Sequence, residues 1–188
     1  MEEKKIMNFI FELGQLKRIK HEGWRIIGVE NPETVGEHAL RAAQIGFILA
    51  KLENYENPFE VCSIVVFHEN EECRTGDIHK VANRYVIAEK EKVVKEQVEK
   101  LEGIGKEIFE LWKQAEYQNT KAGIIAKDAD LLEMAVTAKE YVERGLHYAQ
   151  DWINNVSKTL QTESAKALLN SLKDTDSNSW WQGLKKID

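Results

Sequence analysis

The chain has 188 residues and a mass of 21.7 kDa, enough for one domain whose core needs neither disulfides nor a structural metal. Hydrophobic residues make up 43% and charged residues 31% of the sequence, which excludes wholesale disorder and low-complexity chains. The net charge of −6 and the pI near 5.5 argue against a nucleic-acid polymer as partner, although a local basic pocket for a phosphate group is compatible with them.

The cysteines and the apolar stretches indicate the cellular compartment in which the protein functions. Cys62 and Cys73 form neither a CxxC pair nor a disulfide framework, which favours a reducing compartment. The charged N-terminus leads into an amphipathic segment rather than the apolar core of a signal peptide. The longest apolar stretches, around 45–49 and 64–67, are too short to span a bilayer. We therefore expect a cytoplasmic protein with no membrane partner.

Hydrophobic periodicity predicts a series of helices, over about 3–19, 34–53, 59–72, 84–101, 104–118 and 122–144, followed by two or three shorter ones. Thr34 and Glu37 have the spacing of a capping box, and Pro58 suits the first turn of a helix. No alternating strand pattern exceeds four residues, and there is no internal repeat. The sequence predicts an all-α fold, a compact orthogonal helical bundle.

Two of the five histidines stand out as candidates for chemistry. His38 falls in the first turns of the second predicted helix, and His68 ends the most apolar run of the chain. A lone histidine in such a place is normally a satisfied core residue. An acidic cluster follows His68, however, and Glu72 lies one helical turn beyond it on the same predicted face. A metal at the edge of that face would contact His68 and the adjacent Glu69, with Glu72 above it.

The alternative is that Glu69, Glu71 and Glu72 form a solvated helix end. Three acids at a helix C-terminus oppose the helix macrodipole, so this arrangement costs stability unless a cation compensates. A metal or Arg74 would supply that positive charge.

A further carboxylate comes from the long helix predicted over 122–144. Asp128 and Asp130 point to nearly opposite sides of it, so only one can serve a given site. Asp128 falls within the apolar arc of the helix and Asp130 at its edge, and periodicity does not choose between them. For either residue the alternative is a salt bridge to a lysine or arginine.

The ordered set His38, His68-Glu69 and Asp130 resembles the HD-domain metal-dependent phosphohydrolases, and within them the 5′-deoxynucleotidase branch. The resemblance covers about residues 5–145 of a single domain, 1–188, with 146–188 as a helical extension. Four motifs carry it, Gly23-Trp24, Thr34-Val-Gly-Glu-His38, His68-Glu-Asn-Glu-Glu-Cys-Arg-Thr-Gly-Asp77 and Lys127-Asp-Ala-Asp130. The last motif favours Asp130 over Asp128. One position departs from the family pattern, because Glu69 stands where the family has aspartate.

The resemblance implies a metal-dependent phosphomonoesterase that acts on deoxynucleoside 5′-monophosphates. It implies one divalent metal ion per chain (Mn²⁺, Co²⁺, Fe²⁺, Zn²⁺ or Mg²⁺), held by the ordered set above. It also implies that Glu72 orients or deprotonates the attacking water and that Asp77 assists near the sugar or leaving oxygen. The alternatives are another phosphate-bearing substrate, or a degenerate sensor or scaffold in which Glu69 marks lost catalysis.

The residues that bind the phosphate and the sugar follow less directly from the motifs than the metal ligands do. The relatives have an arginine directly before the tryptophan, and Gly23 occupies that place here. Among the nearby basic residues, Arg25 and Lys80 are the ones that we expect to hold the phosphate, with Arg18 and Lys20 as alternatives. Trp24 is either the wall that disfavours a 2′-hydroxyl or a core aromatic residue.

The C-terminal extension carries two adjacent tryptophans, Trp180 and Trp181. We expect them to dock on the bundle or on a partner subunit, because exposed paired tryptophans are a liability. Homodimers are common among the relatives, so a homodimer is favoured.

Overall fold

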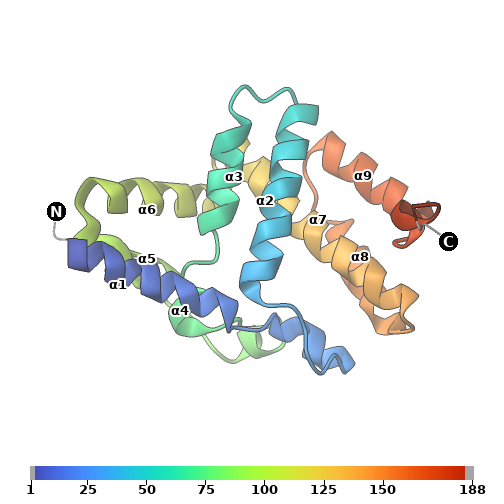
Figure 1. The fold of residues 1–188 in the computed structure, drawn as a ribbon, viewed down its shortest axis with the longest axis horizontal. Coiled ribbons are helices and arrows are strands. Elements are labelled where there is room, and N and C mark those ends of the chain that lie inside the picture. Colours follow the sequence, from blue (N-terminus) through green and yellow to red (C-terminus); the bar gives the residue numbers. More distant parts are fainter. Residues whose placement is uncertain (1–2, 185–188) are drawn as a thin grey trace.

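The computed structural model describes residues 3–184, and these residues hold helices and no strand, so the all-α prediction is confirmed (Figure 1). The α-helices are α1 (Glu3–Leu13), α2 (Val35–Leu52), α3 (Pro58–Phe67), α4 (Glu72–Thr75), α5 (Lys90–Val98), α6 (Glu102–Tyr117), α7 (Lys121–Glu143), α8 (Gln150–Val156) and α9 (Glu163–Asp174). Short 3₁₀ turns lie between them, η1 (Gly14–Lys17), η2 (Glu22–Ile27), η3 (Ala82–Arg84), η4 (Glu99–Leu101), η5 (His147–Ala149) and η6 (Ser179–Trp181). No helix within 3–184 is long and apolar enough to cross a membrane.

The central element is α7, which packs against α2, α3, α6, α8 and α9. In Figure 1 it passes behind the pair formed by α2 and α3. Small residues allow this close crossing, since a Cβ at Gly46 would lie 3.2 Å from Val61 and 3.6 Å from Ala129. The main core is therefore built around α7, and any polar residue that α7 carries on its buried face lies at the centre of the molecule.

The start of α2 follows the sequence prediction. The Thr34 side chain accepts a hydrogen bond from the Glu37 amide, and the Glu37 carboxylate accepts one from the Thr34 amide. This capping box satisfies two free amides and sets where the helix begins. Because the start is fixed, His38 lies in the first turn of α2 with its side chain fully buried.

The end of α3 differs from the prediction. The helix stops at Phe67 instead of residue 72, and the chain turns before α4 begins. In this turn Glu71 is only 1% exposed, and it accepts a hydrogen bond of 2.8 Å from Trp112 Nε1 and forms a 2.8 Å ion pair with Lys90. The residues from His68 to Glu72 therefore do not share one helical face.

The alternative of a salt bridge holds for Asp130, which pairs with Lys127, whereas Asp128 forms no ion pair with a lysine or arginine within residues 3–184. This fully buried carboxylate accepts hydrogen bonds from the amides of Gln161 and Thr162 and from the Thr162 hydroxyl. Asp128 thus joins α7 to the turn that precedes α9, and it takes no part in a site elsewhere on α7.

We expect Asp128→Ala to lower the free energy of unfolding by about 3 kcal/mol, because it leaves buried amides without an acceptor. Urea unfolding followed by circular dichroism measures the change. Asp174→Ala, at the exposed end of α9, is the matched control. A loss below about 0.5 kcal/mol for Asp128→Ala would show that water replaces the carboxylate without cost.

Candidate metal centre

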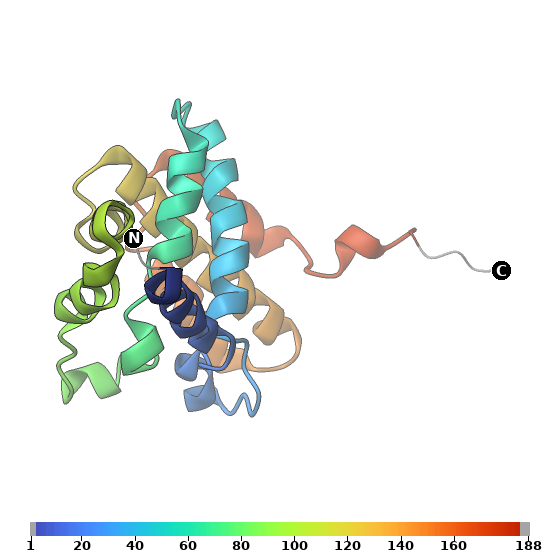
Figure 2. The same ribbon diagram turned by 60° about the vertical axis from the view of Figure 1, so that its left-hand side comes forward.

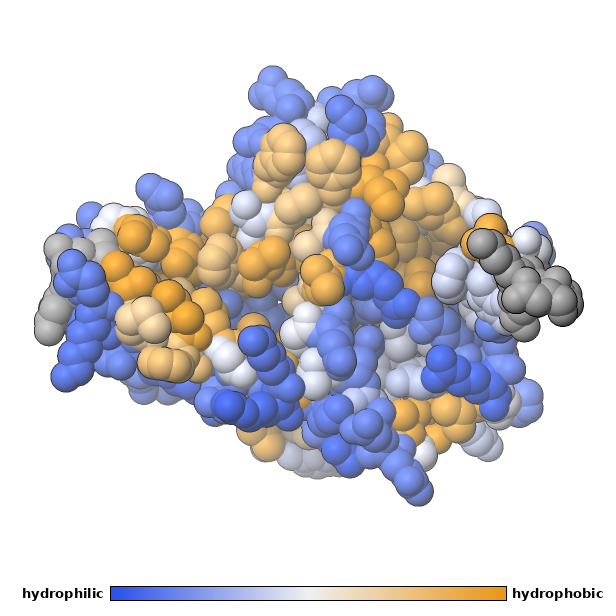
Figure 3. Space-filling view, in the orientation of Figure 1, coloured by the Kyte–Doolittle hydropathy of each residue, from blue (hydrophilic) through white to orange (hydrophobic). Residues whose placement is uncertain are grey.

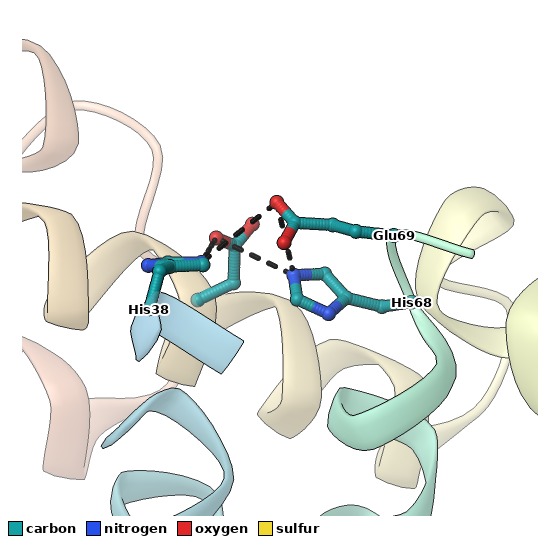
Figure 4. A group of neighbouring side chains, drawn as sticks. His38, His68 and Glu69 are labelled. Atoms are coloured by element: carbon teal, nitrogen blue, oxygen red, sulfur yellow. Dashed lines mark hydrogen bonds and ion pairs between the residues drawn. The ribbon is translucent and has the colours of Figure 1, made fainter. Parts of the chain in front are cut away.

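Four polar side chains from three parts of the chain meet at the centre of the bundle (Figure 4). His38 comes from α2, His68 and Glu69 come from the turn after α3, and Asp130 comes from α7. One nitrogen or oxygen atom from each of the four lies within 4.8 Å of all the others. Asp130 Oδ1 lies 3.1 Å from His38 Nε2 and 3.7 Å from His68 Nε2. Glu69 Oε1 lies 3.8 Å and 3.6 Å from the same two nitrogens.

Both imidazole rings turn Nε2 toward this centre because Nδ1 has an acceptor on the other side. His68 Nδ1 donates to the Val65 carbonyl at 2.6 Å, and His38 Nδ1 donates to the Glu133 carboxylate. A carbonyl oxygen can only accept, so Nδ1 of His68 carries a proton, and Nε2 is the nitrogen that offers a lone pair toward the centre when the ring is neutral. The rings are thus oriented as metal-binding histidines are.

Glu133 contacts His38 on the Nδ1 side of the ring, and Arg41 in turn contacts Glu133. The sequence analysis missed both residues. Glu133 is completely buried, and it also accepts hydrogen bonds from Arg41 Nε at 2.8 Å and from Thr137 Oγ1 at 2.9 Å. Burial opposes ionisation, but the hydrogen bonds and positive charges of His38 and Arg41 hold the pKa of Glu133 below its usual value. The sequence signal that could have identified Glu133 was its spacing, because Asp130, Glu133 and Thr137 recur at i, i+3 and i+7 on one face of α7.

Acidic side chains lie close together at the centre. Asp130 forms a 2.6 Å ion pair with Lys127, and although burial opposes it, this charge and the hydrogen bond from His38 hold the pKa of Asp130 well below its usual value. Burial, with the nearby charges of Glu69 and Asp77, raises the pKa of Glu72 to about 10. Among the residues that the structure describes, the buried atoms Glu69 Oε2, Glu72 Oε2 and His68 Nε2 have no hydrogen-bond partner.

A divalent cation fits this centre on the chemistry of its donors. Two imidazole nitrogens and two carboxylate oxygens converge, and the unsatisfied His68 Nε2 belongs to this set. A cation there would offset the repulsion that disfavours ionised Glu72. Arg74 does not supply this charge, because it pairs with Glu12 and Glu96 instead.

Asp77 and His21 border the centre on the side of η2. Asp77 Oδ2 accepts a 2.6 Å hydrogen bond from the Glu22 amide, which ties the turn after α4 to η2. The ring of His21 lies 4.7 Å from the ring of His38, and its Nδ1 lies 3.4 Å from Glu33. His21 is a third residue that the sequence analysis missed, and it lies two residues before the Gly23-Trp24 motif.

The three expected substrate-binding residues do not gather at the centre. Trp24 is 1% exposed and stacks on Trp152 with ring centroids 4.9 Å apart, so the structure favours the core interpretation over a sugar-site wall. Arg25 is exposed and forms a 2.7 Å ion pair with Glu22. Lys80 is exposed as well. Within residues 3–184, neither basic side chain forms an ion pair with the four central side chains.

The chain is similar in sequence and fold to known proteins. The 5′-deoxynucleotidase HDDC2 of Homo sapiens is 30% identical over 145 residues, covering 73% of this chain and 69% of that protein. Its counterpart in Mus musculus is 32% identical over 143 residues, covering 72% and 69%. The fold is similar to a structural-genomics crystal structure with a TM-score of 0.78 at 31% identity, covering 95% of this chain and 99% of that one.

A conserved hypothetical protein from Pyrococcus furiosus also has this fold, with a TM-score of 0.72 at 26% identity and coverage of 90% and 99%. Residues 13–172, most of the chain, match the family described as HD domain. This match, the relatives above and the ordered His38, His68, Glu69 and Asp130 lead to one assignment. The chain belongs to the HD-domain family and is a phosphohydrolase of that family.

Proposed function

We propose that this chain is a metal-dependent 5′-deoxynucleotidase, which releases phosphate from deoxynucleoside 5′-monophosphates. One divalent ion would be held by His38, His68, Glu69 and Asp130. The observation that carries the proposal is the convergence of these four donors, with unsatisfied buried atoms at the same place. The names of the relatives, which are 5′-deoxynucleotidases at about 30% identity, support the substrate class.

The donor set bears on which ion is bound. Mixed imidazole and carboxylate ligands suit Mn²⁺, Co²⁺, Fe²⁺ or Zn²⁺, whereas Mg²⁺ prefers oxygen ligands alone. A bound ion of this kind lowers the pKa of a water molecule and offsets phosphate charge.

Both thiols, Cys62 and Cys73, are free, which supports the reducing cytoplasm expected for the protein.

The remaining carboxylates have roles in proton transfer. In the proposed reaction the oxygen of a water molecule bonds to phosphorus, and the bond from phosphorus to the 5′ oxygen breaks. Glu72 accepts a proton from the water, and the 5′ oxygen takes a proton from solvent as it leaves as a hydroxyl, so that release of the proton from Glu72 to solvent completes the balance. Asp77 assists at the sugar or leaving oxygen, and its bond to the Glu22 amide holds it in place.

Phosphate release from a panel of nucleotides tests the proposal. The panel contains deoxynucleoside 5′-monophosphates, the matching ribonucleotides and 3′-monophosphates, each with Mn²⁺, Co²⁺, Zn²⁺ or Mg²⁺. We expect the deoxynucleoside 5′-monophosphates to be hydrolysed fastest. Equal rates on all phosphates would favour a different substrate. No release with any ion would favour a binding protein without catalysis.

Glu69 allows a sharper test, because its side chain is one methylene longer than the aspartate of the family. We expect Glu69→Asp to retain the metal and keep or raise the rate, and Glu69→Gln to lose both, since the anionic ligand is gone. Metal content and phosphate release are measured on the same preparations. If Glu69→Gln behaved like the unmodified chain, Glu69 would be a solvated acid only.

Glu133 is expected to act through His38. Glu133→Ala removes the acceptor of His38 Nδ1, and loss of such a partner weakens metal binding by about 10–100-fold. Calorimetric titration of the metal-free protein with Zn²⁺ or Mn²⁺ measures the affinity. Glu140→Ala is the matched control, because Glu140 pairs with Arg41 but does not contact His38. An affinity within about threefold of the unmodified chain would mean that the ring is held by packing alone.

A further inference from the structure

The basic side chains around the metal centre differ in what their donors already contact. The guanidinium of Arg41 donates to two carboxylates and one hydroxyl, so each of its nitrogens is engaged. The Lys20 amine donates to the Pro32 carbonyl at 2.8 Å. Within residues 3–184, Lys127 is the one lysine or arginine that forms an ion pair with any of the four central side chains. Lys127 is therefore the fixed cation at the edge of the centre.

Asp130 connects Lys127 to the metal centre through its two oxygens. Asp130 Oδ1 lies 3.1 Å from His38 Nε2 and 3.7 Å from His68 Nε2, among the four donors. Asp130 Oδ2 lies 2.6 Å from Lys127 Nζ, so the second oxygen of the same carboxylate contacts the lysine. Lys127 and Asp130 are three residues apart on α7, which makes them neighbours on one face of the helix. The ammonium therefore lies one carboxylate away from the converging donors.

The ammonium of Lys127 keeps donors for a ligand. A lysine ammonium has three N–H donors and no acceptor, and the bond to Asp130 uses one of them. The Lys127 side chain is 35% exposed against 6% for Asp130, so the lysine borders solvent whereas the carboxylate is enclosed. In the part of the chain that the structure describes, no second acid lies within ion-pair distance of this amine. Positive charge and free donors are thus available to an anion at the centre.

The outer surfaces of the bundle leave this lysine uncovered. Figure 3 shows hydrophobic colour gathered over α2 and α3, where the rings of Phe47 and Phe59 lie 5.8 Å apart, and this surface offers an anion no charge. Lys127 lies in the second turn of α7, which packs on α6. Residues 175–184 leave the body on the opposite side from α6 in Figure 2. Trp180 is 75% exposed there, so it does not dock on its own bundle, which was one of the two expected outcomes.

We propose that Lys127 binds the phosphate group of the substrate, an inference that rests on the proposed function. Asp130 reaches from the four donors to the lysine with two oxygens of one group. Two oxygens of a phosphate have a similar spacing, so a phosphate can place one oxygen among the donors and another on the ammonium. The ammonium also offsets the repulsion that Glu72 and Asp77 exert on a dianion. A deoxynucleoside without phosphate makes no use of this lysine.

Lys127→Gln tests the assignment, because glutamine keeps an N–H donor for Asp130 and removes the charge. Calorimetric titration of the Mn²⁺-loaded protein with inorganic phosphate and, separately, with deoxyadenosine measures the two affinities. We expect phosphate to bind about 10–100-fold more weakly, the loss that removal of a charged hydrogen bond causes. The affinity for deoxyadenosine and the metal content should not change. Lys139→Gln, which removes another ion-paired lysine of α7, is the matched control and should leave both affinities as they are.

A second measurement uses the unmodified protein, so it does not depend on the folding of a variant. Brief acetylation followed by mass spectrometry of the peptides reports how accessible each lysine amine is. Inorganic phosphate added to the Mn²⁺-loaded protein should slow the acetylation of Lys127 and leave that of Lys139 unchanged. Equal acetylation of Lys127 with and without phosphate would contradict the contact.

The outcomes for Lys127→Gln separate this inference from the proposed function. A phosphate affinity within about threefold of the unmodified chain would show that the lysine only neutralises Asp130, and the proposal would be overturned. Loss of metal from the variant overturns it too, because Lys127 would then act through Asp130. No phosphate binding by the unmodified protein has the same consequence. None of these readouts needs hydrolysis, so a chain that hydrolyses no nucleotide fails the proposed function while the role of Lys127 is still decided.

Discussion

His68→Ala should lose nearly all bound metal and, with it, phosphate release. His68 Nε2 is one of four donors, and a site with four protein ligands rarely holds its ion after one is removed. The remaining donors include two carboxylates whose repulsion the ion would offset, so they do not compensate for the lost imidazole. Metal analysis after dialysis should fall from about one ion per chain to near zero.

His147→Ala is the control for this change, because His147 lies in η5 and is exposed. It should keep both metal and rate. Circular dichroism of both variants checks that the bundle is intact, since His68 also donates to the Val65 carbonyl. Unchanged metal content in His68→Ala would show that the four side chains are a polar core cluster and not a metal site.

Glu72→Gln should reduce kcat by about 10²–10⁴-fold while metal and nucleotide binding persist. Glu72 lies beyond Glu69 with a buried oxygen that has no partner, so it is placed to accept a proton without being one of the four donors. Glutamine keeps the shape of the side chain and removes only the ability to take the proton. Burial and the neighbouring acids raise the pKa of Glu72 to about 10, so the neutral amide costs the metal-free protein little stability.

The measurement for Glu72→Gln combines phosphate release with calorimetric binding of a deoxynucleoside monophosphate to the same preparation. Glu89→Gln makes the same chemical change at an exposed position and is the matched control. A rate equal to that of the unmodified protein would show that another group accepts the proton. Loss of metal together with rate would instead make Glu72 a ligand.

Local sequence signals determined much of the fold. The spacing of apolar residues located the main helices, because helical periodicity is a property of neighbouring residues. The capping box of Thr34 and Glu37 set the start of α2 and with it the position of His38. The order of His38, His68, Glu69 and Asp130 indicated the family, and the match over residues 13–172 confirmed it.

Tertiary contacts decided the rest, since they join residues that no local pattern connects. In the turn that follows α3, buried Glu71 accepts a hydrogen bond from Trp112, which lies 41 residues away. Periodicity did not distinguish Asp128 from Asp130, but their tertiary partners do. Asp128 accepts hydrogen bonds from amides that precede α9, whereas Asp130 lies against His38. Trp24 could have faced a ligand or the core, and Trp152, far along the chain, placed it in the core. Burial of a polar or aromatic side chain depends on which distant group satisfies it, and only the packed structure supplies that group.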